Sequence, residues 1–94
     1  SSEAMSNATQ TQTEPVLEID ERKTIGNEVH RLRLYRLPEL SSRWADGIAR
    51  RFELVYTWMD ATTGGVKGQE CQGATFKDFR ACKRVGIFGH YNLF

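Results

Sequence analysis

The stretch 29-VHRLRLYRL-37 decides the fold, because two kinds of side chain alternate along it in the pattern of a β-strand. Successive side chains of a strand point to opposite faces of the sheet. We therefore expect Leu32 and Leu34 to enter a core, with His30 and Arg36 on the same face. The opposite face would carry two arginines, a tyrosine and a leucine: Arg31, Arg33, Tyr35 and Leu37.

The residues on either side of this strand carry signals for its ends. Residues 16–20, VLEID, predict a shorter strand. Gly26 and Asn27 carry turn chemistry, because both tolerate a positive φ. We expect a hairpin between the two strands, with a connection longer than two residues. Pro38 is expected to end the longer strand, because proline has no N–H to donate to a sheet.

The next segment carries a helical pattern. Trp44, Ile48 and Phe52 recur at intervals of four residues, which places them on one side of a helix. One of the two serines that precede them could cap its first turn. The favoured interpretation is a helix over residues 41–52.

Residues 53–60 allow two interpretations. Their alternation and their aromatic and β-branched side chains favour a strand. On a single helix over residues 41–60, Leu54 and Trp58 would instead extend the apolar surface onto a charged face. Gly47 would also weaken such a helix by about 1 kcal/mol relative to alanine. We favour the strand, and the long helix stays as the alternative.

The C-terminal third predicts a hairpin and a helix. Residues 61–65 form a loop, and residues 66–71 a weaker returning strand. Thr75 is placed to cap a helix over residues 76–85, with Phe76, Phe79, Cys82 and Val85 on one side. Gly86 would end that helix.

Together these elements predict one small α+β domain over residues 15–94. We expect a three- to four-stranded, mainly antiparallel sheet with one or two helices packed on one face, in the order β-β-α-β-β-α. Residues 1–14 are rich in Ser, Thr, Gln and Asn and predict a disordered tail. Met5 offers a native start, in which case residues 1–4 would be an expression remnant; the sequence leaves both interpretations open.

Composition bears on the cellular location of the protein. No apolar run among its 94 residues approaches the ~20 needed to cross a bilayer, and the N-terminus has no secretory signal. Its two cysteines are too few for a disulfide scaffold. We expect a cytoplasmic protein with no membrane partner.

Metal, cofactor and nucleophile signatures are absent from the sequence. His30, Cys71, Cys82 and His90 contain no closely spaced pair of the kind that structural zinc sites use. We expect Cys82 to pack in the core, with a Cys71–Cys82 disulfide as the alternative. No cofactor is expected, and nothing fixes the geometry of a Cys–His catalytic pair.

The glycine-rich run 64-GGVKG-68 raises the question of phosphate binding. It departs from the GxxxxGK[ST] pattern and lacks the hydroxyl that would hold magnesium. We expect these glycines to serve a hairpin loop.

Charge is distributed unevenly along the chain. Residues 1–30 carry six acidic and two basic side chains, whereas residues 31–94 carry eleven basic and six acidic ones. A basic, aromatic sheet face next to a basic helix could bind nucleic acid. The competing interpretation is a solvated basic surface with local ion pairs such as Arg50 with Asp46. The candidate nucleic-acid-binding residues are Arg31, Arg33, Tyr35, Lys77, Arg80, Lys83 and Arg84.

Large apolar side chains are abundant for so short a chain, and they motivate the leading functional hypothesis. Such residues dominate interface energetics, which favours a small non-enzymatic interaction module that binds another protein or forms a homo-oligomer. The candidate interface residues are Trp44, Trp58, Phe88, Tyr91 and Phe94, and the apolar end from residue 87 should pack on the domain or on a second copy.

A third functional hypothesis is a small ribonuclease that works without a metal. General acid–base chemistry and phosphate stabilisation would then fall to Arg80, Arg84, His90 and Tyr91. Because only composition and size support this hypothesis, no catalytic residue is assigned.

Overall fold

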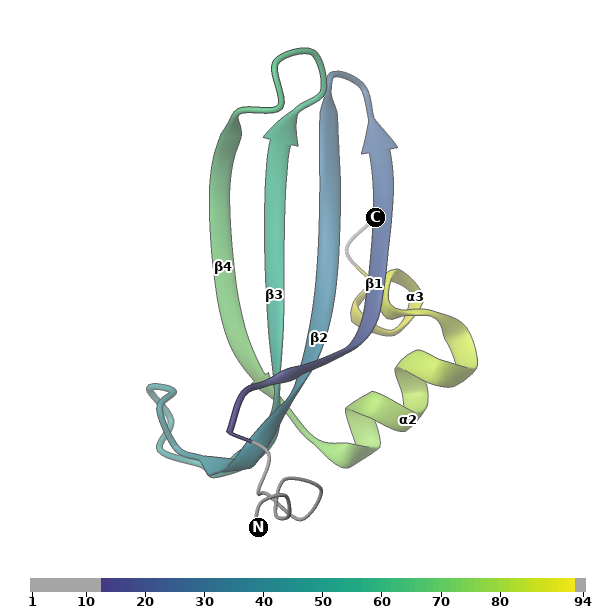
Figure 1. Cartoon of the computed structure of the whole chain (residues 1–94). Helices are drawn as coiled ribbons and strands as arrows, with labels where there is room; N and C mark the ends of the chain where they lie inside the picture. Colours follow the sequence, from purple (N-terminus) through teal and green to yellow (C-terminus); the bar gives the residue numbers. More distant parts are fainter. Residues whose placement is uncertain (1–12, 93–94) are drawn as a thin grey trace, which may run out of the picture.

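The computed structural model describes residues 13–92 and contains one antiparallel sheet of four strands, in the spatial order β1-β2-β3-β4 (Figure 1). Two helices follow the strands, so the α+β class and the antiparallel sheet are confirmed. The expected tail lies outside the described residues except for its last two positions, and so does Phe94. The elements are β1 (Val16–Ile25), β2 (Glu28–Ser41), β3 (Arg50–Asp60), β4 (Val66–Ala74), α2 (Phe76–Val85) and α3 (Ile87–Tyr91).

The β1–β2 hairpin is tighter than expected. Ile25 pairs directly with Glu28, which leaves only Gly26 and Asn27 in the turn. Gly26 has φ +59°, a conformation that costs glycine little. Glycine at the first turn position is typical of a type II′ hairpin, whose twist matches that of the strands. The prediction of a longer connection was therefore wrong.

The alternation along β2 is confirmed. Leu32 and Leu34 are completely buried, and Arg31 and Arg33 lie on the other face. β2 does not end at Pro38, however, but continues to Ser41. The pairing with β3 is interrupted between Arg36 and Ser41, so the missing proline N–H breaks no ladder hydrogen bond there.

The predicted helix over residues 41–52 is wrong. Gly47 has φ +71°, and its N–H donates to the Trp44 carbonyl at 2.9 Å, which makes a turn in place of a helix. The Asp46 carboxylate reinforces the turn by accepting the Ile48 N–H at 2.9 Å. Ile48 is 55% exposed, so the four-residue spacing did not mark a buried face.

The strand interpretation of residues 53–60 is confirmed, and the single long helix is excluded. β3 begins at Arg50 and places Phe52 at the centre of the core, fully buried. β3 and β4 are joined by the expected loop over residues 61–65, in which Gly64 has φ +76°. Gly64 and Gly65 thus lie in the hairpin loop as expected, whereas Gly68 belongs to β4. β4 runs to Ala74, three residues further than predicted.

The predicted second helix is confirmed as α2. Thr75 and Asp78 form a reciprocal capping box at its start, and Gly86 follows its last residue. α3 continues directly from Gly86 and buries Ile87 completely, so the described part of the apolar end packs on the domain. The order is β-β-β-β-α-α, because the first predicted helix does not form and the short helix α3, which was not predicted, follows α2.

The helices lie against one face of the sheet, beside the lower half of the strands in Figure 1. We call this the helix face. The buried core lies between this face and the helices: Leu32, Leu34, Phe52, Leu54 and Ala74 from the sheet, with Cys82 of α2 and Ile87 of α3. The opposite face, which we call the open face, carries the side chains of Arg31, Arg33, Tyr35, Glu53, Val55 and Thr57 and is covered by no helix of the described residues.

Candidate functional site

The basic residues of β2 are engaged in contacts within the domain. Arg31 donates two hydrogen bonds to the Asp20 carboxylate of β1, at 2.9 and 2.7 Å. Arg33 donates to the Tyr35 hydroxyl at 3.0 Å and to the Thr57 hydroxyl at 3.3 Å. The guanidinium of Arg31 is the main cause that lowers the pKa of Asp20. The ion pair with Asp20 offsets the charge of Arg31, whereas the neutral hydroxyls hold the Arg33 side chain and leave its charge in place.

The basic residues of α2 lie on the other side of the sheet. Phe79 and Cys82 turn toward the core, and the basic side chains of the helix are exposed beyond them. The candidate nucleic-acid-binding residues therefore do not form one surface: Arg31, Arg33 and Tyr35 lie on the open face, and Lys77, Arg80, Lys83 and Arg84 lie outside the helix face. Nucleic-acid binding stays a prediction that this arrangement does not favour.

Of the four ribonuclease candidates, His90 and Tyr91 take part in helix packing, whereas Arg80 and Arg84 are exposed on α2. His90 Nε2 of α3 lies 2.8 Å from Asp78 Oδ1, the same aspartate that caps α2. Burial alone would raise the pKa of Asp78, but its hydrogen bonds with Thr75 and His90 outweigh burial and lower it. Burial also raises the pKa of the Tyr91 phenol. The contacts of His90 are those of a side chain that ties α3 to α2.

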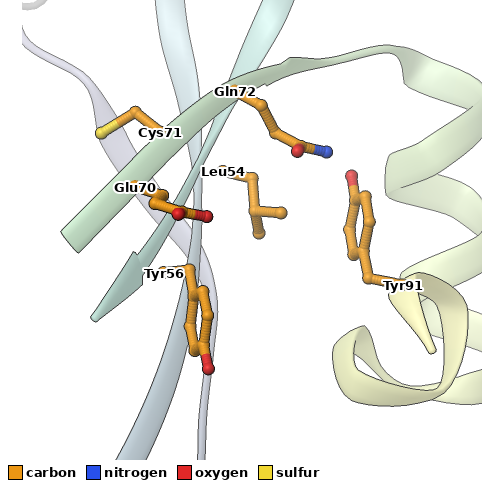
Figure 2. A pocket seen from close by; sticks show the side chains of 6 residues that line it. All are labelled: Leu54, Tyr56, Glu70, Cys71, Gln72 and Tyr91. Carbon is orange, nitrogen blue, oxygen red and sulfur yellow. The ribbon is translucent and has the colours of Figure 1, made fainter. Parts of the chain in front are cut away.

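Three of the five candidate interface residues lie along β4. The Trp58 ring of β3 lies across Gly68 of β4, and the Trp44 ring lies across Gly73. Tyr91 faces the same strand from α3 (Figure 2). Phe88 lies elsewhere, with the Lys23 ammonium of β1 6.0 Å from its ring centre, and Phe94 is outside the described residues.

The glycines of β4 make room for these rings. A Cβ on Gly68 would overlap the Trp58 ring, and a Cβ on Gly73 would come within 2.9 Å of the Trp44 ring. Trp58 and Gly68 are direct cross-strand partners, so the ring replaces the packing that glycine lacks. The two tryptophans cover β4 from opposite faces, because Gly73 pairs with Glu53 of the open face.

The two edges of the sheet differ in how well they are protected from pairing with a further strand. Half of β1 is charged, since residues 18 and 20–23 are Glu, Asp, Glu, Arg and Lys. Such charges discourage a further strand from pairing with an edge. β4 carries only Lys67 and Glu70, and Lys67 is bound to Glu28 at 2.6 Å. Among residues 13–92, no other strand pairs with the outer side of β4.

A hollow lies on each side of β4. On the helix face, a cavity of about 510 Å³ is bounded by Leu54 and five further residues: Tyr56, Glu70, Cys71, Gln72 and Tyr91 (Figure 2). A more open hollow of about 470 Å³ adjoins Trp44, Asp46, Arg50 and Gly73. β4 thus combines unpaired backbone with recessed, partly aromatic flanks.

The titratable residues considered for metal chemistry are dispersed. His30 is buried, with its Nδ1 2.7 Å from the Tyr56 hydroxyl and its Nε2 3.1 Å from Glu28. Cys82 packs in the core as predicted, and burial raises the pKa of its thiol to about 11. Cys71 is exposed and forms no disulfide with Cys82. Within the described part of the chain, no three His, Cys, Asp or Glu side chains gather as metal ligands would.

Comparison with known proteins assigns no family. No protein-family model matches the chain, and no curated protein and no solved structure matches it significantly. Within residues 13–92, neither helix has the length and apolar character that a membrane crossing requires.

The sequence did not lead us to predict β4 as part of a functional site, although its composition is typical of an edge strand. Its run VKGQECQGA is polar and contains two glycines, which is typical of an edge strand that neighbouring rings cover. The apolar residues of the cavity wall, Leu54 and Tyr56, belong to β3, and no local pattern marks them as lining a cavity.

The turn that carries Trp44 should open in acid. Arg50, together with the Ile48 N–H, lowers the pKa of Asp46 to about 2. A carboxylate with a lowered pKa stabilises the fold above its ordinary pKa, and this contribution is lost as the pH falls through the lowered value. We expect the NMR signal of the Trp44 indole N–H to move between about pH 4 and pH 2.

Asp46→Asn should show the acid form of that signal already at neutral pH. Glu39→Gln, which neutralises an exposed acid on β2 and away from the turn, serves as the control and should leave the signal in place. A Trp44 signal that stays constant down to pH 2 would contradict the role given to Asp46.

Proposed function

We propose that this chain is a small non-enzymatic interaction module that self-associates by pairing β4 with β4 of a second copy. The unequal protection of the two sheet edges carries the proposal. β1 is blocked by charge, whereas β4 is an exposed strand of nine residues with two charged side chains. An exposed edge with unpaired N–H and C=O groups is a template for a further strand.

A second copy fits this edge because of its symmetry and its charge. A two-fold axis would place β4 antiparallel to itself and join two four-stranded sheets into one. The edge carries one base, Lys67, and one acid, Glu70, so it presents no row of like charges to its own copy. Trp44 and Trp58, beside the edge on opposite faces, would add apolar contact area.

The expected association is weak. Strand pairing at one edge buries a small area, so its dissociation constant should fall near about 10–100 µM, in the range of transient complexes. Sedimentation velocity from about 5 µM to about 1 mM therefore spans the transition from monomer to dimer. A thiol reductant keeps Cys71, which is exposed on β4, from cross-linking the copies.

A matched pair of lysine variants locates the interface. Cys71→Lys adds a positive charge near the middle of β4, where the two copies would meet, and should leave the protein monomeric over the whole range. Thr24→Lys makes the same addition on exposed β1 and should dimerise like the wild type. A wild type that stays monomeric at all concentrations, or equal loss of dimer in both variants, would refute the proposal.

A further inference from the structure

The cavity beside β4 is lined by a single charged side chain, that of Glu70. Figure 2 shows Leu54 in the middle of the site, with Tyr56 and Tyr91 on two sides of it and Glu70 and Gln72 on the strand above. Glu70 is the one ionisable carboxylate among the lining residues, and no lysine or arginine lines the cavity. The volume of about 510 Å³ lies in the range of small-molecule sites, which runs from about 300 to 1,000 Å³.

Glu70 has no ionic partner within the described residues. Other acidic residues of the sheet have such partners: Glu28 binds Lys67, Glu18 binds Arg36 at 2.8 Å, and Asp20 binds Arg31. The negative charge of Glu70 is felt at the cavity wall. Burial first, and then the charges of Glu28 and Glu70, raise the pKa of Tyr56. The site therefore offers an uncompensated negative potential next to an aromatic ring.

The Tyr91 hydroxyl is a second unsatisfied group. Its oxygen is buried and has no hydrogen-bond partner in the described structure. In Figure 2 this oxygen points toward the Gln72 amide side of the cavity. Buried polar groups are nearly always hydrogen-bonded in folded proteins, so an orphaned hydroxyl at a cavity wall indicates a missing partner. A ligand N–H could donate to it.

The apolar lining completes the requirements for one class of ligand. Leu54 is nearly fully buried and forms the floor, which suits a hydrocarbon stem. The tyrosine rings attract cations through their π electrons, and a carboxylate strengthens that attraction. An anionic ligand would meet only Glu70 and would be repelled.

We propose that this cavity binds an alkylammonium group, with the hydrocarbon stem on Leu54, the rings of Tyr56 and Tyr91 beside the cation, and Glu70 as its counter-charge. The group could be carried by a free amine or by a lysine side chain, which share this chemistry. The site goes beyond self-association and does not depend on it, because Glu70 reaches the helix face with its side chain whereas strand pairing uses the backbone of β4.

The test is an NMR titration of the 94-residue chain, kept dilute so that it is monomeric, with n-pentylammonium. We expect concentration-dependent shifts at Tyr56, Glu70 and Tyr91. The neutral isostere 1-pentanol and the anion pentanoate should bind at least about tenfold more weakly. Nα-acetyl-lysine amide distinguishes the two sources: shifts of the same residues indicate a lysine side chain, and their absence, with pentylammonium binding intact, indicates a free amine.

Two variants keep the test decisive. Glu70→Gln preserves size and should lower affinity for pentylammonium at least about tenfold, while Glu39→Gln removes the same charge away from the cavity and should bind normally. Tyr91→Phe should bind more weakly yet melt no lower than the wild type, because the lost hydroxyl has no partner in the fold. Pentanol binding as tightly as pentylammonium, or full affinity in Glu70→Gln or Tyr91→Phe, would overturn the proposal.

Discussion

Phe52→Ala should destabilise the protein more than any other single truncation, by about 3–5 kcal/mol. Phe52 is fully buried in β3 and stacks on Phe79 of α2, with ring centres 4.9 Å apart. Phe76 meets it edge-on at 5.0 Å, and the Arg36 guanidinium lies 5.0 Å from its ring centre. The ring thus joins the sheet to α2, and alanine would leave a cavity between the two layers.

This loss is large relative to the total free energy of unfolding of the domain. A domain of about 80 residues has a total free energy of unfolding of roughly 4–12 kcal/mol. We therefore expect a large fraction of the Phe52→Ala protein to be unfolded at 37 °C. Urea unfolding followed by circular dichroism measures the effect. Phe76→Ala is the matched control, because Phe76 touches the same ring but is 43% exposed and should lose about 1 kcal/mol. Equal losses in the two variants would contradict this description of the core.

Gly68→Ala should cost about 1–3 kcal/mol although it adds only a methyl group to an edge strand. The new Cβ would overlap the Trp58 ring, which must then leave its place over β4. On an ordinary edge position, alanine would instead be neutral or stabilising relative to glycine. Thermal unfolding measures the loss, and a change in the fluorescence of Trp58 reports the displaced ring.

A double-mutant cycle assigns the loss to the ring. In a Trp58→Ala background the overlap no longer exists, so adding Gly68→Ala should cost nothing or stabilise the protein. A penalty that persists without the ring would mean that Gly68 is required for its backbone and that Trp58 does not cover it.

The strands and the second helix could be predicted because local pattern and tertiary environment agree there. Leu32 and Leu34 alternate with Arg31 and Arg33, and the sheet has one covered and one open face. At Thr75 the capping residue, the apolar stripe and the terminating glycine all indicate the same helix. The structure of a segment can be predicted from its sequence where the local pattern and the tertiary environment favour the same element.

Residues 41–52 could not be predicted because two local signals conflict. The four-residue spacing of Trp44, Ile48 and Phe52 favours a helix, whereas Asp46 and Gly47 favour a turn. The turn forms because Phe52 gains more by entering the sheet core than the helix would gain from an exposed Ile48. The expected ion pair of Arg50 with Asp46 does form, at 2.7 Å, but within this turn.

The candidate site could be predicted only in part. Trp44, Trp58 and Tyr91 were singled out for their size, and each of them lies beside β4. Their common location depends on strand order, which places β4 at an edge, and no local pattern specifies that order. The lack of an ionic partner for Glu70 likewise depends on which side chains the fold places around it, and the sequence alone does not specify this.

Amide hydrogen exchange, measured by NMR at low and at high protein concentration, tests the role of the β4 edge most directly. In an edge strand, alternate N–H groups point away from the sheet and exchange quickly until a further strand accepts them. Self-association predicts that these N–H groups of β4 slow by at least about tenfold as concentration rises, while those of β1 are unchanged. Exchange on β4 that is independent of concentration, or protection that arises on β1 instead, would contradict the account.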